Sequence, residues 1–265
     1  MNYKEHLIAC GKRMLHSGLT VETWGNISVR DPETGLIYLT PSGMPYDSIT
    51  GEDIVVMRPD GTIAEGFRKP TAEWAMHLGI MNARRDVNAI IHTHPIYSQV
   101  FAVLHEDIPP VIDEAAQAMG GDVKTAEYAL PGTKELAQNA LAALGNGAAC
   151  LLANHGALTW GKDPEQAYMR MESLEYYATV SMYTGHIIGQ ANELTCEQVD
   201  RLVDTRTRLG IQSGGRPVCR HAEAGEPRPC ECGLCNLTPA ALSELICHLI
   251  ATLPEDVIRL LRHSS

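Results

Sequence analysis

Two short, nearly continuous apolar runs constrain the fold of this 265-residue chain more than any other feature. Residues 88–93 (NAIIHT) and 148–153 (AACLLA) are typical of buried strands. Further strand-like pieces and helical patterns alternate with them: strands at 25–30, 36–40 and 54–57, and helices at 3–17, 72–83, 134–144 and 163–183 and from Ile96. This alternation predicts an α/β sandwich over residues 1–210, with helices covering a central sheet. Several connections are too short for crossovers, which favours antiparallel pairing.

The composition changes near residue 210, which predicts a second region. Residues 211–237 are rich in Gly, Pro and Cys, and residues 238–262 resume a helical pattern. We therefore expect one main α/β domain at 1–210, and a Cys-rich loop with C-terminal helices at 211–265. Four of the eight cysteines gather in this loop: Cys219, Cys230, Cys232 and Cys235. Four thiolates suit a structural Zn²⁺, although an iron–sulfur cluster or simply reduced thiols are alternatives.

Charge and hydropathy narrow the classes of partner. The formal charge of -11 argues against a nucleic-acid-binding surface, which needs a basic face. It leaves room for a small phosphorylated substrate, because one metal ion and a few backbone N–H groups make a locally positive pocket. No apolar run approaches the roughly 20 residues that span a bilayer, and the N-terminus lacks the apolar stretch of a signal peptide. We expect a cytoplasmic protein with no membrane contact.

Three histidines are placed to bind a metal. His92 and His94 stand two apart at the end of the 88–93 run, so both imidazoles point to one face. His155 follows the 148–153 run and precedes Gly156, which permits close backbone approach. Three imidazoles at strand ends are a typical divalent-metal set that leaves a coordination position open. The alternative is a group of hydrogen-bonded core histidines.

A carboxylate and three turn-like segments complete the set of candidate residues. Glu73 lies in the first turn of the helix at 72–83, where an acid that merely stabilises the helix dipole is also common. The three segments carry small residues, hydroxyls and accessible N–H groups, as a phosphate pocket needs: WGNIS at 24–28, TPSG at 40–43 and PTA at 70–72. Each is an ordinary turn by itself.

Taken together, these motifs resemble the class II aldolase/adducin family. The matching elements are GNIS at 25–28, TPSGMPY at 40–46, KPTAEWAMH at 69–77, HTHP at 92–95 and NHGAL at 154–158. Their order and spacing cover about three quarters of the chain, roughly residues 5–205. The resemblance implies a three-layer α/β/α fold around a mostly antiparallel sheet. It also implies a homotetramer with active sites between subunits.

The resemblance also assigns roles to residues. It makes His92, His94 and His155 ligands of Zn²⁺, with Mn²⁺ or Co²⁺ equally suited to nitrogen ligands. Glu73 becomes the acid/base, a task that favours a pKa raised toward neutrality. Asp113, or the adjacent Glu114, becomes a second proton-transfer group from a neighbouring subunit. The substrate-phosphate pocket is formed by Gly25, Asn26, Ser42, Gly43 and Thr71.

The implied activity is that of a metal-dependent aldolase, a carbon–carbon lyase. It cleaves a ketose 1-phosphate of the fuculose or ribulose type to dihydroxyacetone phosphate and an aldehyde. Two other enzyme reactions use the same kind of site: epimerisation of a pentulose 5-phosphate and decarboxylation of a phosphorylated keto acid. A carboxylate at Asp113 favours the epimerase among these two. A non-enzymatic, adducin-like interaction module is the remaining alternative, and retention of the histidines and Glu73 argues against it.

Overall fold

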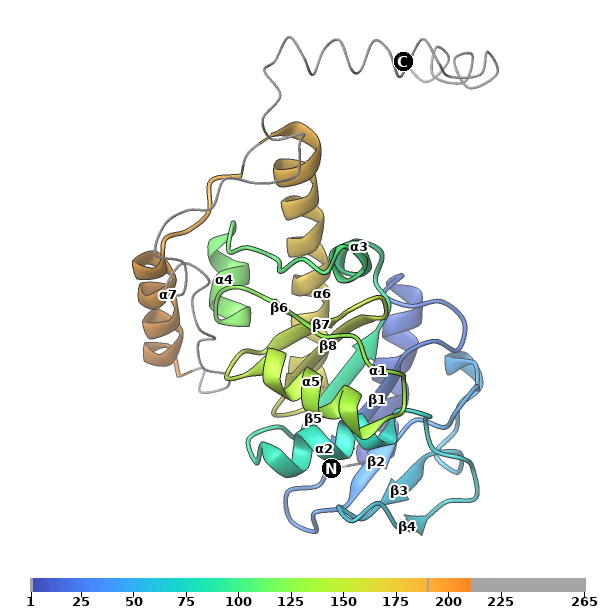
Figure 1. Ribbon diagram of the computed structural model, residues 1–265. Coiled ribbons are helices and arrows are strands. Elements are labelled where there is room, and N and C mark those ends of the chain that lie inside the picture. Colours follow the sequence, from blue (N-terminus) through green and yellow to red (C-terminus); the bar gives the residue numbers. More distant parts are fainter. Residues whose placement is uncertain (1, 190, 211–265) are drawn as a thin grey trace, which may run out of the picture. The chain divides into compact units, whose positions relative to one another are not determined.

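A mixed, mainly antiparallel sheet forms the centre of the fold (Figure 1). The computed structural model describes residues 2–189 and 191–210. Within them, eight strands follow the order β4-β3-β2-β1-β5-β8-β7-β6. The strands are β1 (Asn26–Arg30), β2 (Ile37–Leu39), β3 (Val55–Met57), β4 (Ile63–Glu65), β5 (Ala89–Thr93), β6 (Lys124–Ala126), β7 (Ala149–Leu152) and β8 (Gly156–Gly161). Neighbours pair antiparallel except β6 and β7, which are parallel.

Helices pack on both faces of this sheet. They are α1 (Tyr3–His16), α2 (Trp74–Ala83), α3 (Ile96–Leu104), α4 (Asp113–Met119), α5 (Lys134–Leu144), α6 (Pro164–Ser181) and α7 (Cys196–Arg208), with the short η1 (Tyr46–Ser48) and η2 (Met182–Ile188). The core against α2 and α5 contains Ile90, and the core against α1, α3, α4 and α6 contains Ile91. Because successive β5 residues enter opposite cores, both faces of β5 are apolar, which explains its continuous apolar run. Figure 1 shows α2 and α5 lying together on one face.

Most of the predicted elements are present with small changes in their bounds. The helix predicted at 134–144 is α5, and the helix expected from Ile96 is α3. The helix at 163–183 begins at Pro164, after Asp163, whose side chain accepts a hydrogen bond from the Gln166 backbone N–H. The short elements β4, α4, β6 and β8, and helix α7, were not anticipated. The boundary near 210, the appendage at 211–265 and the site at Cys219, Cys230, Cys232 and Cys235 lie outside the described residues.

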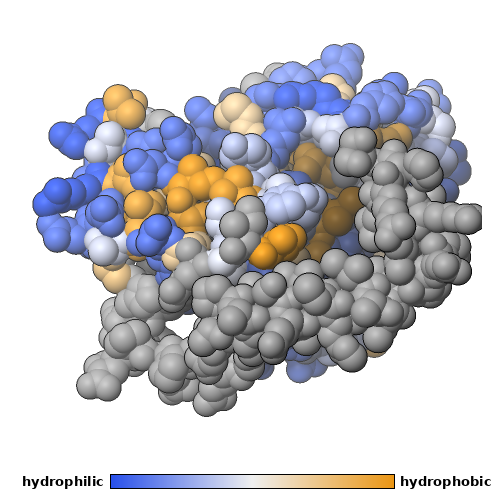
Figure 2. Space-filling view, turned by 90° about the horizontal axis from the view of Figure 1, so that it is seen from above, coloured by the Kyte–Doolittle hydropathy of each residue, from blue (hydrophilic) through white to orange (hydrophobic). Residues whose placement is uncertain are grey.

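The surface carries several large apolar side chains. Figure 2 shows hydrophobic side chains gathered between hydrophilic ones on the face that it displays. Over the described residues as a whole, large apolar side chains that are more than half exposed include Trp24, Ile96, Leu130, Tyr176 and Ile187. Within residues 2–189 and 191–210, no helix has the length and hydrophobicity needed to cross a bilayer.

Candidate functional site

The fold brings His92, His94 and His155 to one point. His92 lies in β5 and His94 just after it, while His155 lies in the tight turn that joins β7 to β8 rather than at a strand end. β5 and β8 pair with Thr93 opposite Ala157, so the end of β5 lies beside the start of β8. The ligand nitrogens of the three histidines lie within 4.8 Å of one another. Their ring centroids are 4.6 to 5.2 Å apart.

Gly156 makes this convergence possible. A Cβ atom there would lie 2.6 Å from the His94 ring and 2.6 Å from the Thr93 carbonyl oxygen. Any larger residue at position 156 would push the end of β5, with His92 and His94, away from the turn. Asn154, in the same turn, has a φ of 54°, a left-handed conformation that is typical of three-residue hairpin loops. The turn therefore presents His155 toward the other two rings, with no side chain in between.

The histidine set fits a divalent cation. The Nδ1 of His92 donates to the Ala157 carbonyl at 3.0 Å, which leaves the Nε2 lone pair free for a metal. The Nε2 atoms of His92 and His94 are only 3.1 Å apart. One oxygen of Glu73, Oε1, is buried without a hydrogen-bond partner. A cation among these atoms would satisfy lone pairs that the protein leaves unpaired.

Glu73 faces the histidines from helix α2. It occupies the N-cap position, but its side chain makes no capping hydrogen bond and is only 6% exposed. Its Oε2 lies 3.2 Å from His92 Nε2, and its Oε1 lies 3.5 Å from His155 Nε2. Asn26 donates to Oε2 from its side-chain amide at 2.9 Å. The carboxylate is therefore directed into the site and away from the helix end, contrary to the dipole-stabilising alternative.

The pKa values of the ionisable side chains in the site are shifted in different directions. Burial, together with His92 and His155, lowers the pKa of His94 to about 3. Burial and His92 lower the pKa of His155 to about 4. Burial acts in the same direction on His92, but the Glu73 carboxylate outweighs it and raises the pKa of His92. Burial raises the pKa of Glu73, but His92 and His155 lower it more, so the expected rise toward neutrality is absent.

The three segments expected to hold a phosphate lie next to one another. The backbone N–H of Ser42 donates to the Lys69 carbonyl at 2.9 Å, and that of Thr71 donates to the Thr40 carbonyl at 3.1 Å. The N–H of Ile27 donates to the Thr40 hydroxyl at 3.1 Å. Hydrogen bonds therefore connect the segments at 24–28, 40–43 and 70–72, although they are far apart in the sequence.

The five candidate phosphate-binding residues differ in their exposure. Ser42 and Gly43 are exposed, Gly25 is partly buried, and Asn26 and Thr71 are buried. Gly25 has a φ of 73°, and a Cβ there would lie 2.6 Å from the His92 carbonyl oxygen, so β1 approaches β5 closely at this point. Asn26 uses its amide inside the protein, on Glu73, which the sequence did not suggest.

Asp113 and Glu114 are not part of this group. They begin helix α4, and both are exposed. Within the described residues of the single chain, no hydrogen bond or ion pair joins either carboxylate to the histidines or to Glu73. Their expected role is from a neighbouring subunit, so the single chain does not test it.

Three side chains at the site belong to the motifs quoted from the sequence, but those motifs assigned them no role of their own. His77 and Ser28 continue the hydrogen-bonded chain that begins at Glu73 and Asn26. Trp24 places its exposed indole against the His94 ring, with centroids 5.5 Å apart. Two signals in the sequence could have found the buried pair. Glu73 and His77 are four apart on one helix face, and Asn26 and Ser28 are two apart on one strand face.

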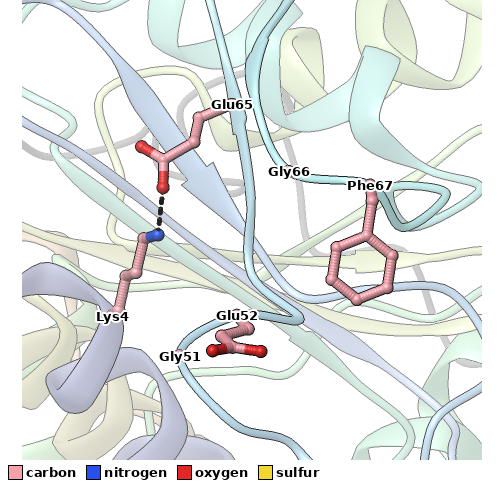
Figure 3. Close-up of a pocket in the computed structure, with 6 residues that line it drawn as sticks. All are labelled: Lys4, Gly51, Glu52, Glu65, Gly66 and Phe67. Atoms are coloured by element: carbon pink, nitrogen blue, oxygen red, sulfur yellow. Dashed lines mark hydrogen bonds and ion pairs between the residues drawn. The ribbon is translucent and has the colours of Figure 1, made fainter.

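A hollow lies beside β4, an edge strand of the sheet (Figure 3). It is lined by Lys4, Gly51, Glu52, Glu65, Gly66 and Phe67. The Lys4 ammonium and the Glu65 carboxylate are 2.5 Å apart and neutralise each other. Strands β3, β2 and β1 separate β4, which supplies Glu65, from the histidine-bearing β5. This hollow offers no unpaired buried group and is separate from the histidine site.

Comparisons with known proteins agree on one protein family. Residues 5–182 match the family described as Class II Aldolase and Adducin N-terminal domain. The chain is 38% identical over 209 residues to the 5-deoxy-D-ribulose 1-phosphate aldolase of Bacillus thuringiensis serovar kurstaki, covering 79% of this chain and 97% of that protein. It is 31% identical to the L-fuculose phosphate aldolase of Escherichia coli strain K12, over 75% of this chain and 91% of the relative.

A solved structure agrees with the sequence matches. An L-fuculose 1-phosphate aldolase superimposes with a TM-score of 0.75 at 39% sequence identity. The match covers 78% of this chain and 96% of that one. The similarity therefore extends over nearly the full length of that protein.

Proposed function

Because the chain belongs to the class II aldolase and adducin family, we propose that it is a metal-dependent ketose 1-phosphate aldolase. It would release dihydroxyacetone phosphate and an aldehyde. The observation that carries this proposal is the convergence of three imidazoles and one buried carboxylate on a single point. The names of the relatives support the substrate class, since each is an aldolase of a sugar phosphate.

The reaction requires two proton transfers. The bond between C3 and C4 of the ketose breaks, the C4 hydroxyl loses its proton, and C3 gains one. Bound at His92, His94 and His155, a divalent cation would polarise the ketose carbonyl and stabilise negative charge as a Lewis acid. In the synthetic direction the Glu73 carboxylate takes a proton from C3 of dihydroxyacetone phosphate, and in cleavage the protonated side chain returns that proton to C3. Glu73 is assigned this role because its carboxyl group is held beside the histidines. Asp113 of a neighbouring subunit is our candidate acceptor for the hydroxyl proton.

The phosphate of the substrate would bind beside β1. Gly25 and Gly43 would bring backbone N–H groups there, and Ser42 and Thr71 would bring hydroxyls. The hydrogen bonds that connect these segments support the proposal. Asn26 was expected to join them, but its amide already holds Glu73.

Zinc is our candidate for the metal, with manganese and cobalt as outcomes of the same test. Elemental analysis of the purified protein identifies the ion. About one ion per chain fits the histidine site alone. About two ions per chain would support the further site at Cys219, Cys230, Cys232 and Cys235, which stays a prediction.

We also propose that the protein is a cytoplasmic homotetramer with active sites between subunits. The exposed apolar side chains (Figure 2) and the exposed position of Asp113 support subunit contacts. Light scattering after size-exclusion chromatography measures the mass directly. A monomer at micromolar concentration would contradict the shared active site.

The deciding experiment is an assay with a panel of ketose 1-phosphates, including those of 5-deoxyribulose and fuculose. Dihydroxyacetone phosphate is detected by coupling its reduction to NADH oxidation. We expect turnover that a chelator abolishes and that added metal restores. If the protein retains its metal and releases no dihydroxyacetone phosphate, the aldolase proposal is wrong. Product analysis then separates an epimerase, which gives an isomer, from a decarboxylase.

A further inference from the structure

A buried chain of four polar side chains ends at Glu73. Asn26 donates to Glu73 Oε2 at 2.9 Å, and its Oδ1 lies 2.5 Å from His77 Nε2. His77 Nδ1 in turn lies 2.6 Å from the Ser28 hydroxyl. Ser28 and His77 are fully buried, and Asn26 and Glu73 are 4% and 6% exposed. Each member contacts the next within hydrogen-bonding distance.

The donors and acceptors in this chain fit together in one way. A carboxylate oxygen only accepts, so the NH₂ of Asn26 must face Glu73 and its carbonyl must face His77. That carbonyl also only accepts, so Nε2 of His77 must carry a hydrogen. The Nδ1 of a neutral imidazole then accepts, and the Ser28 hydroxyl donates to it. Burial keeps His77 neutral by lowering its pKa to about 3.

We propose that His77 is a positioning residue for Glu73, acting through Asn26. Its Nε2–H fixes the orientation of the Asn26 amide, and the amide anchors one carboxylate oxygen. Ser28 supports this arrangement by selecting the tautomer of His77. The inference rests on the proposed function, because positioning Glu73 matters for turnover only if Glu73 is the acid/base.

The anchoring leaves the two oxygens of Glu73 in different situations. Oε2 is held by Asn26, whereas Oε1 is buried without a hydrogen-bond partner and lies 3.5 Å from His155 Nε2. A carboxylate held at one oxygen keeps a fixed rotamer while the other oxygen can exchange a proton. An unanchored Glu73 would sample other rotamers, and a displacement of about 1 Å is enough to slow a proton transfer on the order of 100-fold.

Kinetics of two His77 variants test the proposal in the metal-loaded, full-length protein. His77→Phe keeps the ring volume but removes both polar atoms, so kcat should fall about 30- to 100-fold while KM changes less than about threefold. In His77→Gln an amide N–H can still donate to Asn26, so kcat should recover to within about fivefold of wild type. Leu78→Ala, on the same buried helix, is the control: it should lower Tm and leave kcat within about twofold.

Equal losses of kcat in His77→Phe and Leu78→Ala at equal loss of Tm would overturn the positioning role. Failure of His77→Gln to recover activity would do the same. If His77→Phe does not fold, Ser28→Ala replaces it. We then expect a fall in kcat of at least about threefold and faster exchange of the His77 Nε2–H with solvent. No change in either would contradict the proposal.

Nitrogen-15 NMR of the histidine rings gives a readout that needs no turnover. We expect His77 to remain the Nε2–H tautomer from pH 5 to 8. The Asn26 side-chain amide should exchange slowly in the wild type and faster in His77→Phe, where the amide is free to rotate. An Nδ1–H tautomer, or an Asn26 amide unaffected by His77→Phe, would overturn the inference. If wild type lacks aldolase activity, the proposed function fails, and these signals still decide whether His77 positions Asn26 and Glu73.

Discussion

The histidine site and the hollow beside β4 differ in how their polar groups are paired. In the histidine site, ring nitrogens face one another and a buried Glu73 oxygen has no partner. In the hollow, Lys4 and Glu65 neutralise each other, and the Glu65 side chain is 64% exposed. Burying unpaired polar groups costs stability, so a protein retains them where a ligand or a reaction uses them. Chemistry is therefore expected at the site with unpaired groups, whereas the hollow is ordinary surface.

The largest effect is expected when the site loses a metal ligand. His92→Ala removes the fully buried member of the set and leaves Glu73 without its nearest imidazole. We expect loss of the bound metal and a fall in kcat of about 10⁴-fold or more, because the Lewis acid is lost with it. Metal analysis and turnover measure both losses. Retention of a full equivalent of metal by the variant would contradict the assigned ligand set.

Removing only the acid/base should separate binding from chemistry. Glu73→Gln keeps the shape of the side chain, but an amide cannot exchange the proton with C3 as a carboxyl group does. We expect kcat to fall by about 10² to 10⁴ while the metal content stays unchanged. Exchange of the C3 protons of dihydroxyacetone phosphate in D₂O should fall by the same factor. Near-normal exchange would remove Glu73 from the mechanism.

A single methyl group at Gly156 should disturb the convergence itself. The Cβ of Gly156→Ala would lie 2.6 Å from the His94 ring and from the Thr93 carbonyl oxygen, so the turn or the strand end must shift. We expect a loss of about 1–3 kcal/mol in the free energy of unfolding and a weaker metal affinity. Denaturant unfolding and metal titration measure the two effects. Gly51→Ala is the matched control, since a Cβ there meets only the Cδ atom of Lys4, at an ordinary contact distance of 4.0 Å.

The pH dependence of stability should reveal the buried neutral histidines. In chelator-treated protein, His77 and His94 have pKa values of about 3, below the value of about 6.5 for an unfolded chain. The unfolded state therefore binds protons that the folded state rejects. Stability should be complete above pH 6.5 and fall as the pH drops toward 4.5, by up to about 1.4 kcal/mol per unit for each such histidine.

Two residues modify this slope. The pKa of His155, about 4, places it with the other two, whereas the raised pKa of His92 opposes them. Thermal unfolding between pH 7.5 and 5 measures the slope. His77→Gln should flatten it, and a Tm independent of pH in this window would show that these histidines are not held neutral.

The smallest effect is expected in the hollow. Lys4→Met breaks the ion pair with Glu65, and partly exposed pairs of this kind are typically worth less than about 1 kcal/mol. We expect unchanged kcat, unchanged metal content and a Tm within a few degrees of wild type. A large loss of activity in Lys4→Met would show that the two regions do not differ in the way proposed.

The sequence predicted the elements that periodicity marks clearly. Helix α5 has the bounds expected at 134–144, and β5 and β7 lie within the two apolar runs. β8 was missed, because GALTWG has glycine at both ends and no alternation. β4 and β6 are as short as β2 and β3, but they contain the charged residues Glu65 and Lys124 and are mostly not buried, so no apolar run marks them. Helix α4 has only 7 residues, so its buried Ala115, Ala116 and Met119 are too few to establish a helical repeat in the sequence.

The sequence by itself determined which residues are candidates for the site: His92, His94, His155 and Glu73 follow from motif and spacing, and the structure brings the four together. Only the tertiary structure decided how they are supported. The antiparallel pairing of β5 with β8 brings His155 to the strand end, and the packing of α2 on β1 brings His77 to Asn26. The physical reason is that a motif fixes which groups are present and their local direction. Contacts between residues about 50 to 65 positions apart, such as His77 with Asn26 and His92 with Ala157, exist only after the sheet has formed.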